Sequence, residues 1–75
     1  MALTDQQRET LRQIARMDQA LQLVMDVRHR LRDIAYVARL HGRDDLARQA
    51  REAKREAHEL GRLIVEERND LESLP

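Results

Sequence analysis

The 75-residue chain contains no cysteine, tryptophan or phenylalanine, and Tyr36 is its only aromatic residue. Without cysteine it can form neither disulfides nor thiolate metal sites, so its redox compartment cannot be read from the sequence. Without phenylalanine and tryptophan it lacks the bulky side chains that fill most monomeric cores. A chain of this size lies close to the limit at which one core offsets chain entropy. We therefore expect one domain, residues 1–75, that is completed by association.

Helix-breaking residues are also scarce, and the first long stretch without them predicts a helix over residues 5–41. Neither glycine nor proline occurs between Asp5 and Leu40. Thr4 stands three residues before Gln7, which is the spacing of a capping box, in which each residue satisfies a backbone N–H of the other. The sequence thus sets the start of this helix at Thr4.

A second helix is predicted over residues 45–72, after a turn at 42–44. Gly42 suits the left-handed position that ends many helices, because it has no Cβ to clash. Asp44 suits the N-cap of the second helix, because a carboxylate accepts hydrogen bonds from free N–H groups. Such a short turn makes the two helices antiparallel. The predicted fold class is all-α: an antiparallel, coiled-coil-like helical hairpin.

The second helix carries apolar residues at alternating steps of four and three, which is the pattern of a heptad seam. The predicted seam consists of Leu46, Ala50, Ala53, Ala57, Leu60, Ile64, Glu67, Leu71 and Leu74. The antiparallel turn sets residues opposite each other when their numbers add to about 84 or 85. Val24 then faces Leu60, and Val27 faces Ala57. Large residues opposite alanines would let the two backbones approach closely.

Both predicted helices are apolar over a wider arc than one neighbouring helix can cover. The surplus lies at one height, near the middle of the hairpin. We therefore predict a partner or dimer interface formed by Leu21, Leu23, Met25, Leu63 and Val65. The alternative is a set of separate surface residues, which are common on soluble proteins.

Charge is segregated along the hairpin although the whole chain is neutral. Residues 28–55 hold nine basic and four acidic side chains, a net of +5, whereas residues 56–75 carry a net of −4 and residues 1–27 a net of −1. If two hairpins pair with their turns at opposite ends, each basic turn lies beside an acidic open end. This pattern favours a homodimeric four-helix bundle. The alternative is a solvated charged face with pairs along each helix.

A basic tip next to the turn is the second candidate contact surface. Its residues are Arg28, Arg32, Tyr36, Arg39 and Arg43. Tyr36 beside arginines can stack on a nucleic-acid base, or it can pack at the rim of a dimer, which we favour. A formal net charge of zero argues against general affinity for nucleic acid, because that affinity comes from neutralising phosphates.

The sequence predicts no catalytic residue, no metal site and no cofactor. Its only aliphatic hydroxyls are Thr4, Thr10 and Ser73, near the ends of the chain, where they cannot form a nucleophile–base pair with a fixed geometry. There is no glycine-rich phosphate loop and no Glu-x-x-His metal motif.

Composition also bears on location and origin. A charged fraction of 37% and a mean hydropathy of −0.77 exclude a membrane span, and the first residues lack the basic and apolar regions of a signal peptide. We expect a cytoplasmic protein. Lys54 is the only lysine among 14 basic residues, which indicates a GC-rich bacterial or phage genome.

Together these features favour a non-enzymatic protein–protein interaction module: a homodimer that acts as an adaptor, a co-chaperone or a regulator, and that binds a further protein. Two alternatives remain open. One is a nucleic-acid-binding regulator that uses the basic tip, and the other is one subunit of an obligate heterodimer. An enzyme is the least favoured interpretation.

Overall fold

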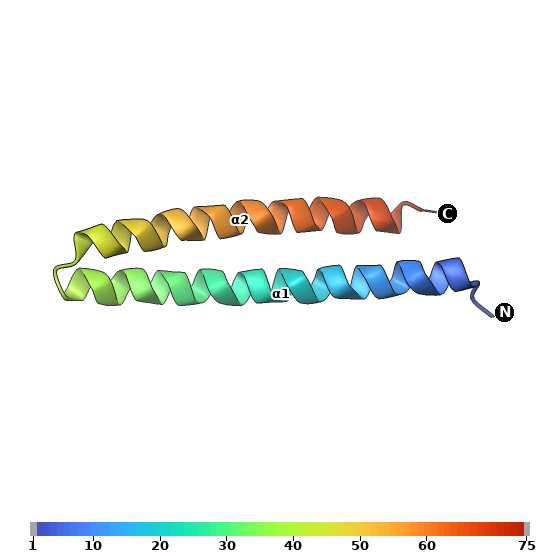
Figure 1. Cartoon of the computed structure of the whole chain (residues 1–75), viewed down its shortest axis with the longest axis horizontal. Helices are drawn as coiled ribbons and strands as arrows, with labels where there is room; N and C mark the ends of the chain where they lie inside the picture. Colours follow the sequence, from blue (N-terminus) through green and yellow to red (C-terminus); the bar gives the residue numbers. More distant parts are fainter. Residues whose placement is uncertain (1, 75) are drawn as a thin grey trace.

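The computed structural model describes residues 2–74, which form two helices, α1 (Asp5–Leu40) and α2 (Asp44–Glu72). The helices lie side by side and antiparallel, with both termini at the end away from the turn (Figure 1). The hairpin is 61 Å long but only 16 by 10 Å across. The predicted all-helical hairpin is confirmed. Neither of the two helices has a stretch long and apolar enough to cross a membrane.

The start of α1 is fixed by the predicted capping box. The Thr4 hydroxyl oxygen accepts a hydrogen bond of 3.1 Å from the backbone N–H of Gln7, and the Gln7 side chain accepts one of 2.9 Å from the backbone N–H of Thr4. Asp5 follows in the first turn, where its charge favours the positive end of the helix dipole.

The turn contains the predicted left-handed glycine, but α2 begins one residue earlier than predicted. Gly42 has φ +72°, and the N–H of Arg43 donates to the carbonyl oxygen of Ala38 at 2.8 Å. Arg43, not Asp44, is the N-cap residue, and no side chain caps this end. Asp44 is already helical, and it stabilises α2 through the helix dipole instead of through a cap.

The predicted register is confirmed by two contacts between the helices. Asp18 forms an ion pair with Arg68, and Gly61 lies directly against Val24. A Cβ atom built on Gly61 would lie 3.4 Å from Val24 Cγ1 and 3.7 Å from Leu21 Cδ1. Residues thus lie opposite each other when their numbers add to about 85.

The observed seam contains many small and charged residues. On α1 the buried and half-buried positions with heptad spacing are Thr10, Ile14, Met17, Leu21, Val24, Arg28, Leu31, Ala35 and Ala38. On α2 they are Ala47, Ala50, Lys54, Ala57, Gly61, Ile64, Arg68 and Leu71. Among the described residues only four apolar side chains are fully buried: Val24, Ala35, Ala47 and Ala50. The hairpin by itself therefore buries little apolar surface.

The predicted seam of α2 was wrong at every second position. Leu46, Leu60 and Leu74 are 40, 51 and 54% exposed, and Glu67 is exposed as well. Ala47, Gly61 and Arg68, which follow Leu46, Leu60 and Glu67 in the chain, are buried or half-buried and lie nearer to α1. Alanine and glycine in the seam let the backbones approach closely, so the bulky leucines lie beside the line of contact instead of on it.

The same displacement holds for α1. Val27, predicted to face Ala57 across the seam, is 46% exposed, and Ile34, two turns further on, is 53% exposed. Val24 lies against Gly61, the residue after its predicted partner Leu60. The large apolar side chains of both helices thus form a second row next to the seam.

Candidate functional site

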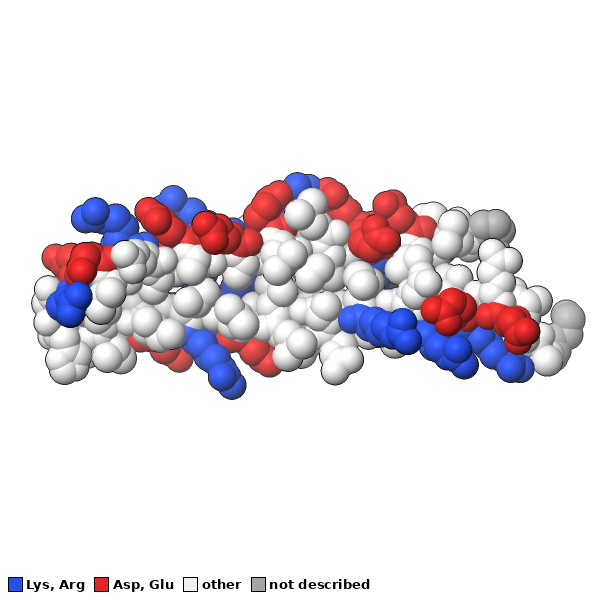
Figure 2. Space-filling view, in the orientation of Figure 1, with Lys and Arg blue, Asp and Glu red and all other residues white. Residues whose placement is uncertain are grey.

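The second apolar row lies on one side of the hairpin. If the seam positions are lettered a and d, the antiparallel helices place their g positions, with the neighbouring c positions, on one side and their e positions on the other. Seven large residues at g and c are each 40–59% exposed: Leu23, Val27, Ile34, Val37, Leu46, Leu60 and Leu63. We call this surface the apolar flank. Figure 2 views it face on, as a white band between charged edges.

One part of the apolar flank is hollowed near the turn. Ile34 and Val37 from α1 and Leu46 from α2 line a shallow groove of about 470 Å³. This shared groove confirms that the g and c positions of both helices lie on one side. Exposed apolar surface that is contiguous over two helices is typical of a protein-contact surface.

At the rim of the apolar flank, charged residues occupy four further c positions, and the uncharged Gln49 occupies another. Arg16 and Arg30 come from α1, and Glu56 and Asp70 come from α2. Within residues 2–74 none of the four forms an ion pair. Their charges are therefore available to a partner that covers the flank.

The opposite side of the hairpin holds a basic groove. Two adjoining hollows of about 330 and 290 Å³ share Arg28 and Lys54. Their basic and histidine lining residues are Arg28, His29, Arg32, Arg51, Lys54, Arg55 and His58. Met25 is the one other lining residue, so no acidic side chain of the described chain lines this groove.

Arg28 is the least satisfied residue of the basic groove. It occupies an a position of the seam, and its Nε is buried with no hydrogen-bond partner within the described chain. Lys54 occupies an a position of α2 and is half-buried. A buried donor without an acceptor costs free energy, and two cations in one groove repel each other. The groove therefore has an unmet preference for negative charge.

The structure separates the predicted interface residues into two sets. Leu23 and Leu63 lie on the apolar flank, 59 and 48% exposed. Met25 and Val65 are exposed too, but they line a hollow on the other side, together with residues of the seam. Leu21 is half-buried in the seam and lines the same hollow. The sequence predicted a surplus of exposed apolar side chains, but not that these side chains lie on two opposite sides of the hairpin.

The predicted basic tip is also divided. Arg28 and Arg32 line the basic groove, while Tyr36 is 63% exposed beyond its end, and Arg39 is exposed. Arg43 is bound to Asp45 by hydrogen bonds of 3.1 and 3.2 Å, which raise the pKa of Arg43 and lower that of the carboxyl.

Sequence reasoning missed the contribution of α2 to the groove. The missed residues are Arg51, Lys54, Arg55 and His58. Their spacing of three and four puts them on one face of a helix, and a correctly placed seam would have shown that this face adjoins Arg28.

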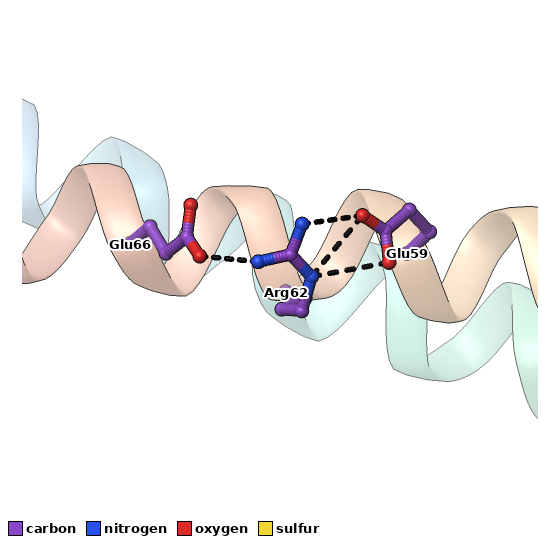
Figure 3. A network of polar contacts seen from close by, with 3 residues as sticks. All are labelled: Glu59, Arg62 and Glu66. Carbon is purple, nitrogen blue, oxygen red and sulfur yellow. Dashed lines mark hydrogen bonds and ion pairs between the residues drawn. The ribbon is translucent and has the colours of Figure 1, made fainter.

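The outer edge of α2 carries a solvated charge network away from both surfaces. Arg62 donates hydrogen bonds of 3.1 Å from Nε to both carboxylate oxygens of Glu59, and its Nη1 reaches Glu66 (Figure 3). The hydrogen bonds from Arg62 lower the pKa of Glu59 and raise that of Arg62. Exposed pairs of this kind stabilise a helix only slightly.

Arg68 links the two helices near the open end. It lies at a seam position and pairs with Asp18 of α1 and, at 2.6 Å, with Glu72 of α2. The hydrogen bond to Asp18 is the main cause of the raised pKa of Arg68. Here, in contrast to Arg28, a seam cation is matched by carboxylates.

The three aliphatic hydroxyls make local contacts only. Thr10 and Ser73 donate to backbone carbonyl oxygens one turn earlier, at 3.1 and 3.0 Å, and Thr4 caps α1. Residues 2–74 contain no group of three His, Asp or Glu side chains placed to hold a metal ion. The apolar flank and the basic groove are the candidate functional surfaces, and both are suited to recognition.

Comparisons with protein-family models, with curated proteins and with solved structures found no match to this chain.

Proposed function

We propose that this protein is a non-enzymatic interaction module, and that its apolar flank binds a second copy to form a homodimeric four-helix bundle. The dimer would then act as an adaptor or regulator through its outward surfaces. The observation that carries this proposal is the charge pattern at the rim of the apolar flank, because that pattern complements itself.

The composition of the helices supports a four-helix core. In a simple two-helix coiled coil both the a and d positions are apolar. On α2 the a positions are Ala47, Lys54, Gly61 and Arg68, whereas the d and g positions hold four of its six large apolar residues. The apolar side of α2 therefore faces partly toward α1, through its d positions, and partly toward the apolar flank, through its g positions. This is the direction of the centre of a four-helix bundle.

A second copy can cover the apolar flank about a twofold axis in two ways. If the axis runs along the hairpin, both turns lie at the same end, and α1 of each copy packs on α2 of the other. If the axis runs across the hairpin, the turns lie at opposite ends, and α1 packs on α1. A twofold interface uses the same patch on both copies, so each contact occurs twice.

Only the first arrangement matches the rim charges. With the turns together, residues at the same height have numbers that add to about 86, as they do within the hairpin. The c-position pairs across the interface are then Arg16 with Asp70, Leu23 with Leu63, and Arg30 with Glu56. With the turns at opposite ends and full overlap, Arg16 meets Arg30, and Glu56 meets Asp70. Four attractive pairs thus become four repulsive ones.

This orientation differs from the one that charge segregation along the sequence favours. The basic groove lies on the side away from the apolar flank, so the two grooves of the dimer are about 20 Å apart, given helix diameters of about 10 Å. That distance exceeds the Debye length of about 8 Å at physiological salt. Contacting rim pairs therefore outweigh repulsion between the two basic ends.

Sedimentation equilibrium of matched variants tests the dimer. Leu23→Glu introduces a charge in the middle of the apolar flank, whereas Met25→Glu introduces the same charge two residues away on the opposite side. We expect wild type and Met25→Glu to be dimers at micromolar concentration, and Leu23→Glu to be a monomer of reduced helicity. A wild-type monomer at all concentrations would contradict the proposal. Equal dimerisation of the two variants would exclude this flank as the interface.

The test also distinguishes the alternative of an obligate heterodimer. A protein that needs a different partner would remain monomeric when purified, with a melting temperature independent of its own concentration. A homodimer melts at higher temperature as its concentration rises, because association favours the folded state by mass action.

A further inference from the structure

The basic groove lies on the side of the hairpin that the proposed dimer leaves open. It is formed by about two turns of each helix, residues 25–32 of α1 and 51–58 of α2. At 1.5 Å per residue each stretch is about 10 Å long. The groove is therefore an elongated channel between two helices, open to solvent along its length.

The cations of the groove are not neutralised within residues 2–74. Arg28, Arg51, Lys54 and Arg55 form no ion pair there, and Arg32 has only a contact of 3.8 Å with the adjacent Asp33. Elsewhere in the hairpin Arg43, Arg62 and Arg68 each have a carboxylate within hydrogen-bond distance. The groove thus gathers several cations whose charge the described residues do not neutralise, with no acidic side chain among the described lining residues.

The buried Nε of Arg28 independently points to an anion. Burial of an arginine nitrogen without an acceptor costs free energy. A chain selected for stability alone would place an apolar residue at this seam position, as it does at Leu21 and Leu31. An anion bound in the groove would give Arg28 and Lys54 the counter-charge that the hairpin does not supply.

We propose that the basic groove binds the phosphate backbone of single-stranded nucleic acid. Four of its five cations are arginines, and the planar guanidinium forms paired hydrogen bonds with phosphate oxygens. A channel about 10 Å long accommodates successive phosphates of one strand. The strand holds these phosphates together, whereas free phosphate ions would have to bind one at a time. Tyr36 lies one turn beyond Arg32, and its exposed ring offers a stacking surface for a base.

The apolar flank and the basic groove then have separate roles. The apolar flank joins two copies, and each copy keeps a basic groove on its outer face. A dimer therefore offers two grooves to one strand or to two strands, and linked sites raise the apparent affinity without any new contact. Nucleic-acid binding in this form does not depend on the dimer, because each groove is complete within one hairpin.

Fluorescence anisotropy with a labelled oligonucleotide of 20 uridines tests the groove. Binding should weaken as salt rises, with a slope of about −0.7 per phosphate contact in a logarithmic plot. Two or three contacts, the number that a groove about 10 Å long can make to one strand, correspond to a loss of roughly 7- to 20-fold between 50 and 200 mM salt. No detectable binding at 50 mM salt would refute the proposal.

Two double variants separate the groove from general charge. Arg51→Gln/Arg55→Gln removes two cations, one turn apart, from the groove, and Arg8→Gln/Arg12→Gln removes two exposed cations with the same spacing at the far end of α1. The groove variant should bind at least about tenfold more weakly and with a shallower salt slope, whereas the control should stay within about twofold of wild type. Equal losses in both variants would mean that binding is not located in the groove.

Tyr36→Ala and an acidic peptide complete the test. Tyr36→Ala should weaken oligonucleotide binding by fivefold or more, because stacking contributes about 1–3 kcal/mol per base. A labelled peptide of 20 glutamates should bind more weakly than the oligonucleotide at equal salt. Tighter binding of the peptide would overturn the nucleic-acid assignment and indicate an acidic protein segment as the ligand.

Discussion

Arg28 carries a charged side chain into the line between the two helices, where its buried Nε has no acceptor among residues 2–74. Arg68 occupies the corresponding row on α2, but it is paired with Asp18 and Glu72. The same residue type in the same kind of position is thus satisfied at one end of the hairpin and unsatisfied at the other. At the residue scale this difference is the observation that supports the proposed binding groove.

Replacing Arg28 by Met should therefore stabilise the free protein. Methionine has a similar length and fills the seam without a buried donor, so we expect a gain of about 1 kcal/mol in the free energy of unfolding. Urea denaturation without nucleic acid measures it, and Arg48→Met, an exposed position, is the control. A loss of stability in Arg28→Met would show that the arginine has an internal structural role.

The two glycines should respond with opposite signs to substitution by alanine. A Cβ on Gly61 meets Val24 and Leu21 at ordinary contact distances of 3.4 and 3.7 Å, so Gly61→Ala should gain most of the helix propensity of alanine, about 0.5–1 kcal/mol. Gly42 has φ +72°, where a Cβ is strained, so Gly42→Ala should lose about 1 kcal/mol. Thermal unfolding at fixed protein concentration distinguishes the two. A stabilised Gly42→Ala would contradict the turn geometry.

At the scale of the element, α2 has charge pairs along its outer edge but lacks a side-chain cap at its first turn and a basic residue in its last turn to complement the helix dipole. Glu59, Arg62 and Glu66 form the network of Figure 3 at its middle, close to the helix-weakening Gly61. The network thus supports α2 where its local propensity is lowest.

This network predicts part of the response of α2 to acid. Hydrogen bonds from Arg62 lower the folded-state pKa of Glu59 below its ordinary value of 4.5, so the network stabilises the fold above that pH and loses its effect as pH falls through the lowered value. Wild type should therefore lose more stability than Arg62→Gln between about pH 5 and pH 2, as measured by urea midpoints. Arg48→Gln should behave as wild type. Equal losses in wild type and Arg62→Gln would assign no role to this pairing.

At the scale of the whole molecule, the orientation of the dimer makes a prediction whose sign differs between the two arrangements. With the turns together, Arg30→Glu replaces attraction to Glu56 of the second copy by repulsion, twice per dimer. The dissociation constant should rise about tenfold, since exposed pairs contribute about 0–1 kcal/mol each. With the turns at opposite ends, the same variant would face Arg16 and dimerise more tightly.

Sedimentation equilibrium at low salt decides between these outcomes. Adding Glu56→Arg to Arg30→Glu restores an attractive pair in the arrangement with the turns together, so the double variant should recover most of the wild-type affinity. Tighter association of Arg30→Glu alone would reverse the proposed orientation while leaving the homodimer intact.

The limits of both helices and the turn were readable from the sequence to within one residue because local contacts decide them. Thr4 and Gln7 satisfy each other within one turn of chain, and Gly42 relieves a steric clash of its own backbone. The absence of any helix breaker between residues 5 and 40 needs no distant partner to act. The register followed from the same features, because a short turn leaves two long helices little freedom to slide.

Only the tertiary structure decided which apolar row the hairpin uses for itself. The sequence offers α2 two adjacent rows, one with Leu46 and Leu60, the other with Ala47 and Gly61, and hydrophobicity favours the first. The hairpin packs on the second, because small residues let two backbones approach where leucines cannot. The leucines are left on the apolar flank, and the opposite side brings Arg28 together with the cations of α2. Both candidate surfaces follow from that one-residue rotation, which depends on contacts between residues far apart in the chain.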